Sequence, residues 1–156
     1  MVLVLSFALL CLLSAMLAWI DIRHGIIPDW LNLTIAGIGF SKALIVLGPP
    51  TAFELVGEGA AIGAVFWLLR WGYFAVRRIQ GIGLGDVKFL AADGIWIGVA
   101  GIPMLLLIAA LTALAGAAVM QLAGDRLNAH TAISFGPFLT IGLLFTAGLQ
   151  QYWPCC

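Results

Sequence analysis

Charged residues are scarce in this chain of 156 residues. They make up 9% of it, whereas hydrophobic residues make up 63%. A soluble domain of this size carries about 25% charged residues to cover its surface. The shortage excludes an ordinary water-exposed surface and indicates that the lipid bilayer is the main solvent. We therefore expect one all-α transmembrane domain over residues 1–156.

Other absences narrow the class of function. The formal net charge is zero and no long basic tract occurs, so a nucleic-acid partner is not expected. The three cysteines form no C-x-x-C spacing, and the two histidines lie far apart. We therefore expect neither a metal nor another cofactor.

Six long apolar runs follow one another along the chain. They cover residues 2–20, 30–47, 53–73, 87–100, 103–123 and 133–149. The run at 87–100 is about 21 Å long as a helix, which is too short to span the hydrocarbon alone. The pattern predicts a polytopic membrane protein with about six transmembrane helices. Its connections are short and leave no room for a soluble domain.

The basic residues predict the orientation. Six of the seven lie in the first, third and fifth connections, and only Lys42 lies near the opposite side. Basic connections mark the cytoplasmic side of a membrane protein. The six are Arg23, Arg70, Arg77, Arg78, Lys88 and Arg126. We expect a multi-pass protein of the plasma membrane with both termini outside the cytoplasm.

Two acidic residues border apolar runs on that cytoplasmic side. Asp21 ends the first run, and Asp86 precedes the short fourth run. Two carboxyl groups at one depth can share a proton, with one acting as base toward water and the other as acid. The alternative is that each caps a helix or pairs with an arginine. Topology alone leaves these two interpretations about equally supported.

The residues around Asp86 favour a functional site. Gly83 and Gly85 form a G-x-G-D motif, in which backbone can approach a substrate strand closely. Lys88 could hold a carboxylate or contact lipid headgroups. Asp29 follows a proline and precedes an apolar run, so it is expected to cap a helix, with a substrate role as the alternative.

Three sequence blocks carry a resemblance to a known family. They are D-I-R at 21–23 followed by I-P-D-W-L-N-L at 27–33, G-I-G-L-G-D-V-K-F-L-A-A at 81–92, and S-F-G-P-F-L at 134–139. Their order and spacing resemble the type IV prepilin peptidases, which are G-x-G-D aspartic proteases of bacterial inner membranes. The resemblance covers essentially the whole chain. It implies that Asp21 and Asp86 are the catalytic pair.

The resemblance also implies a substrate and an orientation. The substrates would be prepilin or pseudopilin precursors with a basic leader and an apolar segment, cut at the cytoplasmic face of the inner membrane. The larger family members carry an additional amino-terminal region with a C-x-x-C zinc motif and methylate the new amino terminus. This chain has no such motif, so we expect a stand-alone peptidase. Ser134 stands where family members often have proline.

Two further expectations concern protons. Asp21 lies at the carboxyl end of its helix and Asp86 at the amino end of its helix, so the helix dipoles predict a protonated Asp21 and an ionised Asp86. Asp93 replaces a residue that is usually apolar in the family. We expect it to be protonated and hydrogen-bonded to a neighbouring helix. The pair Gly136-Pro137 is interpreted as a packing feature rather than as chemistry.

Two other classes of function remain open from the residues alone. Buried acids also serve proton-coupled transporters, but those commonly contain internal repeats, and none is evident here. A non-catalytic assembly subunit of a pilus or secretion machine is the other alternative. Cleavage of a prepilin by the purified protein would separate the peptidase from both.

Overall fold

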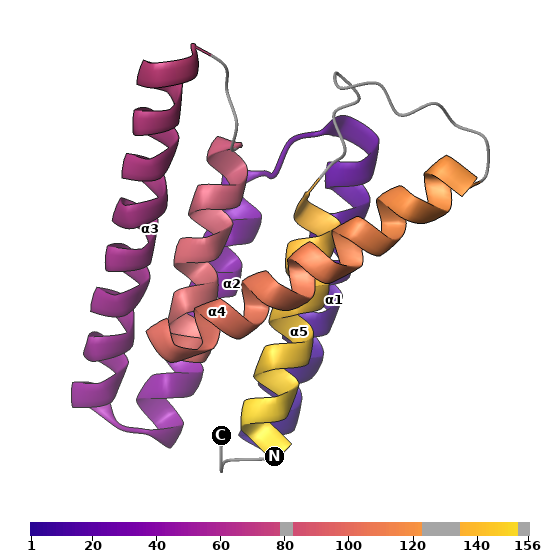
Figure 1. The fold of residues 1–156 in the computed structure, drawn as a ribbon. Helices are drawn as coiled ribbons and strands as arrows, with labels where there is room; N and C mark the ends of the chain where they lie inside the picture. The colour runs from indigo at the N-terminus through magenta and orange to yellow at the C-terminus, as the bar shows by residue number, and fades with distance from the viewer. Residues whose placement is uncertain (79–82, 123–134, 153–156) are drawn as a thin grey trace.

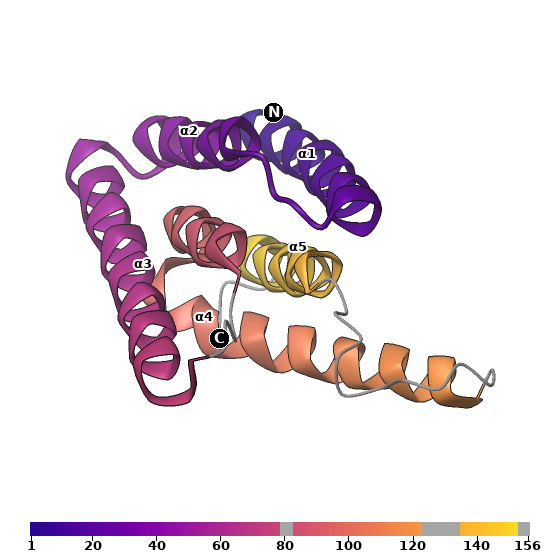
Figure 2. The ribbon, with the colours of Figure 1, turned by 90° about the horizontal axis from the view of Figure 1, so that it is seen from above.

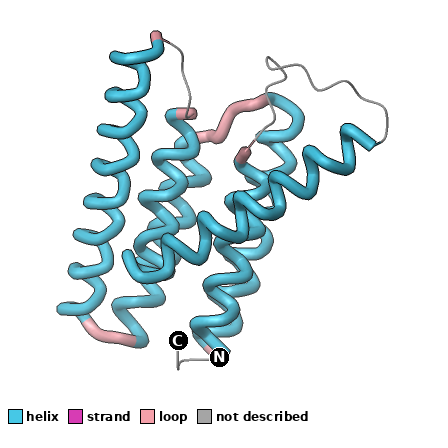
Figure 3. The backbone as a smooth tube through the Cα atoms, viewed as in Figure 1, coloured by secondary structure: helices cyan, strands magenta, loops and turns pink. Residues whose placement is uncertain are grey.

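Helices make up nearly all of the described chain, and no strand occurs in it (Figure 3). The computed structural model describes residues 1–78, 83–122 and 135–152. Within these residues the helices are α1 (Val2–His24), α2 (Asp29–Val46), α3 (Pro49–Arg77), α4 (Leu84–Leu122) and α5 (Gly136–Tyr152). The expected all-α class is confirmed. Arg126, Ser134, Cys155 and Cys156, which entered the sequence analysis, lie outside the described residues.

The expected count of six helices is not confirmed, because the fourth and fifth apolar runs belong to one element, α4. This helix has a break at Gly98, whose φ of 67° and ψ of 173° are not helical. Glycine permits such backbone angles, which other residues rarely adopt. The backbone N–H of Val99 donates to a Glu58 carboxylate oxygen at 2.6 Å. The carbonyl of Ile97 accepts from the Gln150 amide at 3.0 Å. The polar groups freed by the break are thus hydrogen-bonded.

Three of the described helices are long and apolar enough to cross a membrane. They are α1, residues Pro49–Val76 of α3, and α4. Large hydrophobic side chains are also exposed on these helices, among them Leu12, Trp67 and Leu114. Such a surface is stable in lipid but not in water. The chain is therefore a membrane protein.

The helices form layers that place three helix ends together. Viewed from above, α1 and α2 form one layer, and the first part of α4 lies beside α5 in a second layer (Figure 2). The second part of α4 crosses on the side of this second layer that is opposite α1 and α2, and α3 flanks the first part of α4 (Figure 2). The carboxyl end of α1 and the amino ends of α4 and α5 lie toward the upper side of Figure 1.

Small residues allow α3 and α4 to approach closely. A Cβ added at Gly59 would lie 2.6 Å from the Ala91 carbonyl oxygen, and one at Gly63 would lie 2.9 Å from the Ala91 Cβ. A Cβ at Gly94 would meet the Gly59 Cα at 2.8 Å. The Gly59-x-x-x-Gly63 spacing thus serves close packing between the two helices. This contact fixes the first part of α4, which carries Asp86.

Candidate active site

Asp21 lies in the last turn of α1 and is 6% exposed. The helix ends at Gly25, which adopts a left-handed φ of 63° and donates its N–H to the Asp21 carbonyl at 2.8 Å. The side chain of Asp21 points toward α5, where its Oδ2 accepts a 3.0 Å hydrogen bond from the Gly136 N–H. This carboxyl group is therefore buried and held by backbone from another helix.

Asp86 lies in the first turn of α4 and is half-buried. The helix begins after Gly83, whose carbonyl accepts the N–H of Val87 at 3.3 Å. The Asp86 carboxylate in turn accepts a hydrogen bond from the Gly83 N–H. The Asp86 contact corresponds to one half of a capping box, in which the side chain of the third helical residue reaches back to the N–H of the residue before the helix. The arrangement restricts the orientation of the Asp86 side chain.

The structure brings the two acids close together although they lie in different sequence blocks. The carboxyl groups of Asp21 and Asp86 are close enough for the charge on one to act on the other. Each accepts a backbone N–H from a glycine, Gly136 in one case and Gly83 in the other. Within the described residues, no group of three or more histidine, cysteine or acidic side chains could hold a metal ion.

The second glycine of the G-x-G-D motif has a packing role. A Cβ added at Gly85 would stand 2.9 Å from the Cβ of Ile27. Ile27 is buried in the connection between α1 and α2, six residues after Asp21. The absence of a side chain at Gly85 therefore lets the amino end of α4 approach the segment that follows Asp21. Gly83, by contrast, lies against the Asp86 carboxyl group.

Asp29 and Lys88 form an ion pair between α2 and α4. The Lys88 ammonium group lies 2.7 Å from Oδ1 and 2.8 Å from Oδ2 of Asp29. The expectation that Asp29 caps its helix was wrong: Pro28 occupies the capping position and no side-chain cap bond forms. Proline at position 28 shifts the helix start by one residue, and this frees the Asp29 carboxylate to bind Lys88. Of the two interpretations of Lys88, the one in which it holds a carboxylate is confirmed.

Asp93 differs from its expected environment in one respect. It is fully buried, but neither carboxyl oxygen has a hydrogen-bond partner in the described part of the chain. The predicted hydrogen bond to a neighbouring helix is therefore wrong for these residues.

Gly136 is the site residue that the sequence analysis missed. Its pairing with Pro137 was interpreted as packing alone, yet its N–H binds Asp21. A Cβ at this position would lie 2.9 Å from the Asp21 Cγ. The signal available in the sequence was a helix start on the same side of the membrane as the two acids. The free N–H groups of a helix start bind anions. The proton assignment considered only α1 and α4, and it stays a prediction.

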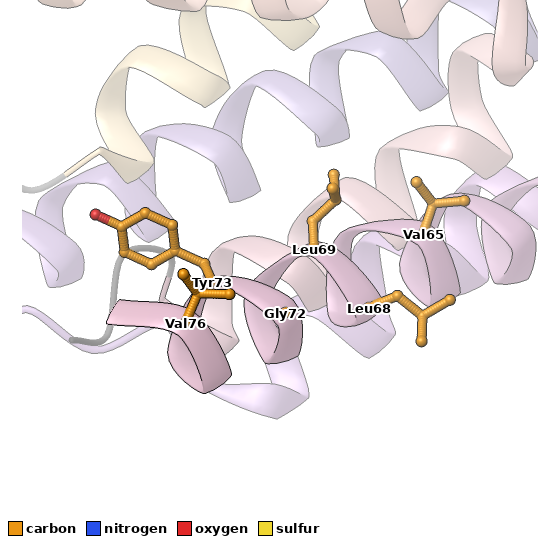
Figure 4. A pocket seen from close by; sticks show the side chains of 6 residues that line it. All are labelled: Val65, Leu68, Leu69, Gly72, Tyr73 and Val76. Atoms are coloured by element: carbon orange, nitrogen blue, oxygen red, sulfur yellow. The ribbon is translucent and has the colours of Figure 1, made fainter. Parts of the chain in front are cut away.

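An apolar groove also runs along α3, away from these residues. It has a volume of about 570 Å³ and is lined by Val65, Leu68, Leu69, Gly72, Tyr73 and Val76 (Figure 4). Only the Tyr73 hydroxyl adds a polar side-chain atom. No residue of the acid pair or of the Asp29–Lys88 ion pair lines it. The groove resembles the rest of the lipid-facing surface and contributes no group to the chemistry.

The known proteins that this chain resembles share the name leader peptidase. The prepilin leader peptidase/N-methyltransferase of Escherichia coli K12 is 37% identical over 136 residues, which are 85% of this chain and 57% of that protein. The protein of the same name from Burkholderia pseudomallei is 39% identical over 140 residues, or 88% of this chain and 43% of that protein. The chain thus spans about half the length of these relatives. No solved structure matches.

A shorter relative matches over nearly its full length. Leader peptidase HopD of Salmonella typhimurium is 32% identical over 141 residues, which are 90% of both chains. A model of the type IV leader peptidase family matches residues 8–118. This stretch includes both acids, the G-x-G-D motif and the Asp29–Lys88 pair. The chain belongs to the type IV leader peptidase family.

Proposed function

We propose that this protein is a membrane aspartic endopeptidase in which Asp21 and Asp86 form the catalytic pair. The observation that carries the proposal is the approach of these two carboxyl groups at one end of the helix bundle. Helix ends in a mostly apolar protein otherwise give little reason for two acids to lie close enough for the charge on one to act on the other. Like charges in such a place favour a shared proton, and a shared proton suits acid–base hydrolysis.

The chemistry follows from the two protonation states of the pair. The ionised carboxylate removes a proton from water, and the resulting hydroxyl oxygen bonds to the carbonyl carbon of the scissile peptide. The protonated carboxyl group donates its proton to the carbonyl oxygen. Collapse of the tetrahedral intermediate breaks the C–N bond, and the amine nitrogen takes up the proton held by the first carboxylate. One hydroxyl proton of the intermediate returns to the second carboxylate, which leaves a carboxylic acid product and restores the pair. Either acid can fill either role in this balance.

The proposed substrates are prepilins or pseudopilins with a basic leader and an apolar segment. The names of the relatives support this class, since they are prepilin leader peptidases and HopD leader peptidases. The apolar segment would lie in lipid beside the enzyme. The leader would remain on the side that carries Arg23, Arg78 and Lys88. The scissile bond would then lie near the carboxyl end of α1 and the amino ends of α4 and α5.

The orientation and the single-domain organisation are also proposals. Arg23, Arg78 and Lys88 lie near the same helix ends as the acid pair, whereas Lys42 lies toward the end of α2. By the positive-inside rule the acid pair faces the cytoplasm of an inner (plasma) membrane. The beginning of α1 and the end of α5 then lie on the outer side (Figure 1).

The test uses purified protein in detergent with a prepilin as substrate and no other component. Asp21→Asn and Asp86→Asn should each abolish cleavage, because asparagine is nearly isosteric with aspartate but cannot act as base or carry the shared proton. Glu54→Gln, which changes an exposed acid at the far end of α3, is the matched control and should cleave normally. Substantial cleavage by either asparagine variant, with both proteins inserted normally, would remove that residue from the pair.

A further inference from the structure

A second set of polar side chains lies deeper in the bundle than the acid pair. Ser14 and Asp93 are 0% exposed and Asn32 is 5% exposed. Five of their polar atoms lack a hydrogen-bond partner in the described chain, namely Ser14 Oγ, Asn32 Nδ2 and Oδ1, and Asp93 Oδ1 and Oδ2. Native proteins rarely leave buried polar atoms unsatisfied. Three such side chains on three different helices call for a common explanation.

Helix geometry places two of the three at the same depth. Ser14 precedes Asp21 by seven residues on α1, and Asp93 follows Asp86 by seven residues on α4. Seven residues make about two helical turns and a rise of about 10.5 Å, so each deeper residue shares the face of its acid. Because the carboxyl end of α1 and the amino end of α4 lie on the same side of the bundle (Figure 1), both residues lie one such step below the acid pair.

The contacts between α2 and α4 place Asn32 at a similar depth. Lys88 binds Asp29 at one point along these helices, and the Trp96 indole N–H donates to the Ile35 carbonyl at 2.8 Å at another. Asn32 lies between the two contact points on α2, as Asp93 does on α4. The two helices run in the same direction there. Asn32 is therefore level with the deeper residues of α4, and its burial directs it inward.

Helices α1 and α4 do not pack directly on each other. No Cα atom of α1 lies within 8 Å of one in α4 in the described chain, although α1 packs on α2 and α5. The two helices are diagonal partners in the layered arrangement (Figure 2). Because each shares the helix face of its acid, Ser14 and Asp93 are expected on the sides of α1 and α4 that carry the acid pair.

We propose that Ser14, Asn32 and Asp93 enclose ordered water beneath the acid pair and that Asp93 holds a proton there. Buried water is stable where two to four polar groups surround it, and the five unpartnered atoms supply both donors and acceptors. No charged side chain of the described chain forms an ion pair with Asp93. A carboxylate buried without a cation is costly, whereas the neutral acid donates one hydrogen bond and accepts others. Use of this water in hydrolysis rests on the proposed function, but its presence does not.

Radiolytic hydroxyl labelling tests for the water. Hydroxyl radicals generated from bound water modify adjacent side chains that bulk solvent does not reach. Phe89, one turn from Asp93 and fully buried, should be labelled several-fold more than Leu105, which is fully buried in the second part of α4. The combined variant Ser14→Ala, Asn32→Leu, Asp93→Leu should lose this difference. Equal labelling of Phe89 and Leu105 in the unchanged protein would overturn the proposal.

Infrared spectroscopy tests for the proton, and it covers the case in which the combined variant does not fold. In a background that carries Asp21→Asn and Asp86→Asn, which removes the carboxyl groups of the acid pair, the protein should show a protonated-carboxyl band that disappears in Asp93→Asn and shifts in deuterated water. Ser14→Ala should shift the band. Ser6→Ala should leave it unchanged, because the buried Ser6 hydroxyl already donates to the Leu3 carbonyl. Absence of the band would overturn the proposal that Asp93 holds a proton. Its replacement by a carboxylate band on addition of Na⁺ would overturn it too, because the site would then hold a cation instead. Neither measurement uses a substrate, so both results stand whether or not the acid pair cleaves peptides.

Discussion

The N–H of Gly136 donates a 3.0 Å hydrogen bond to Oδ2 of Asp21 and joins the start of α5 to the end of α1. The same glycine leaves the space that the carboxyl group occupies, since a Cβ there would lie 2.9 Å from the Asp21 Cγ. Helix α5 contains no acidic or basic residue of its own. It nevertheless determines where the Asp21 side chain lies, and it belongs to the candidate site for that reason.

Gly136→Ala should therefore lower cleavage strongly. Overpacking a tightly packed position costs about 1–3 kcal/mol, which corresponds to a loss of about fivefold to 150-fold if it falls on the reactive geometry. The effect should appear in kcat rather than KM, because the Asp21 carboxyl would be displaced while substrate contacts remain. Gly148→Ala on the same helix is the matched control, because its Cβ would make an ordinary 3.6 Å contact with the Phe7 ring. Equal activity of the two variants would contradict a positioning role for Gly136.

The Asp29–Lys88 ion pair should matter for activity more than for stability. Its side chains are 73% and 47% exposed, and exposed pairs contribute only about 0–1 kcal/mol to folding. The pair nonetheless connects the start of α2 to the turn that carries Asp86. Lys88→Met and Asp29→Asn should each reduce cleavage about tenfold, because small displacements of reacting groups are costly. The thermal unfolding temperature in detergent should change little.

A double-mutant cycle checks whether the two residues act through each other. If the ion pair is the shared cause, the double variant should lose no more activity than either single variant. Additive losses in kcat/KM would indicate two separate roles, such as a contact of Lys88 with substrate. Normal activity in both single variants would exclude the pair from the site.

Much of the helix arrangement could be predicted from the sequence, because lipid imposes a simple pattern of long apolar runs. The runs at 87–100 and 103–123 were expected as separate helices, but the break falls at Gly98 within one element. Glycine is common in membrane helices, so its presence alone does not locate a break. The Glu58 and Gln150 side chains that complete the break come from helices distant in sequence. Single-sequence patterns do not reveal such long-range partners.

The candidate site was predictable in its acids but not in its supporting contacts. Asp21 and Asp86 were selected by their position at run ends on one side of the membrane. The partners of Asp29 and Gly136 depend on how α2, α4 and α5 are placed relative to one another. Local reasoning therefore assigned Asp29 to a helix cap and Gly136 to packing. It also gave Asp93 a hydrogen-bond partner on a neighbouring helix, and the described residues contain none.

Gly98→Ala should destabilise the protein without changing the acid pair directly. A non-glycine residue at φ of 67° and ψ of 173° is strained by about 1–3 kcal/mol. The added Cβ would also approach the Glu58 carboxylate oxygen at 3.0 Å. The unfolding temperature in detergent should fall by several degrees. Gly37→Ala, a helical position with no neighbour within 4 Å of the added Cβ, should be neutral or stabilising. If Gly98→Ala unfolds at the same temperature as Gly37→Ala, the break is not constrained by this residue.

The orientation of the acid pair can be measured with cysteine reporters. Ile26 is 66% exposed in the connection after α1, and Leu47 is 52% exposed in the connection after α2. Each would be changed to cysteine in a background in which Cys11, Cys155 and Cys156 are replaced. A membrane-impermeant maleimide added to spheroplasts should label Leu47→Cys at once and Ile26→Cys only after lysis. The reason is the concentration of basic residues near the end of α1, which retains that side in the cytoplasm. Cleavage of a prepilin by both cysteine variants would show that the labelled proteins are correctly folded. Labelling of Ile26→Cys in intact spheroplasts would place Asp21 and Asp86 on the outer face, where a cytoplasmic leader could not reach them.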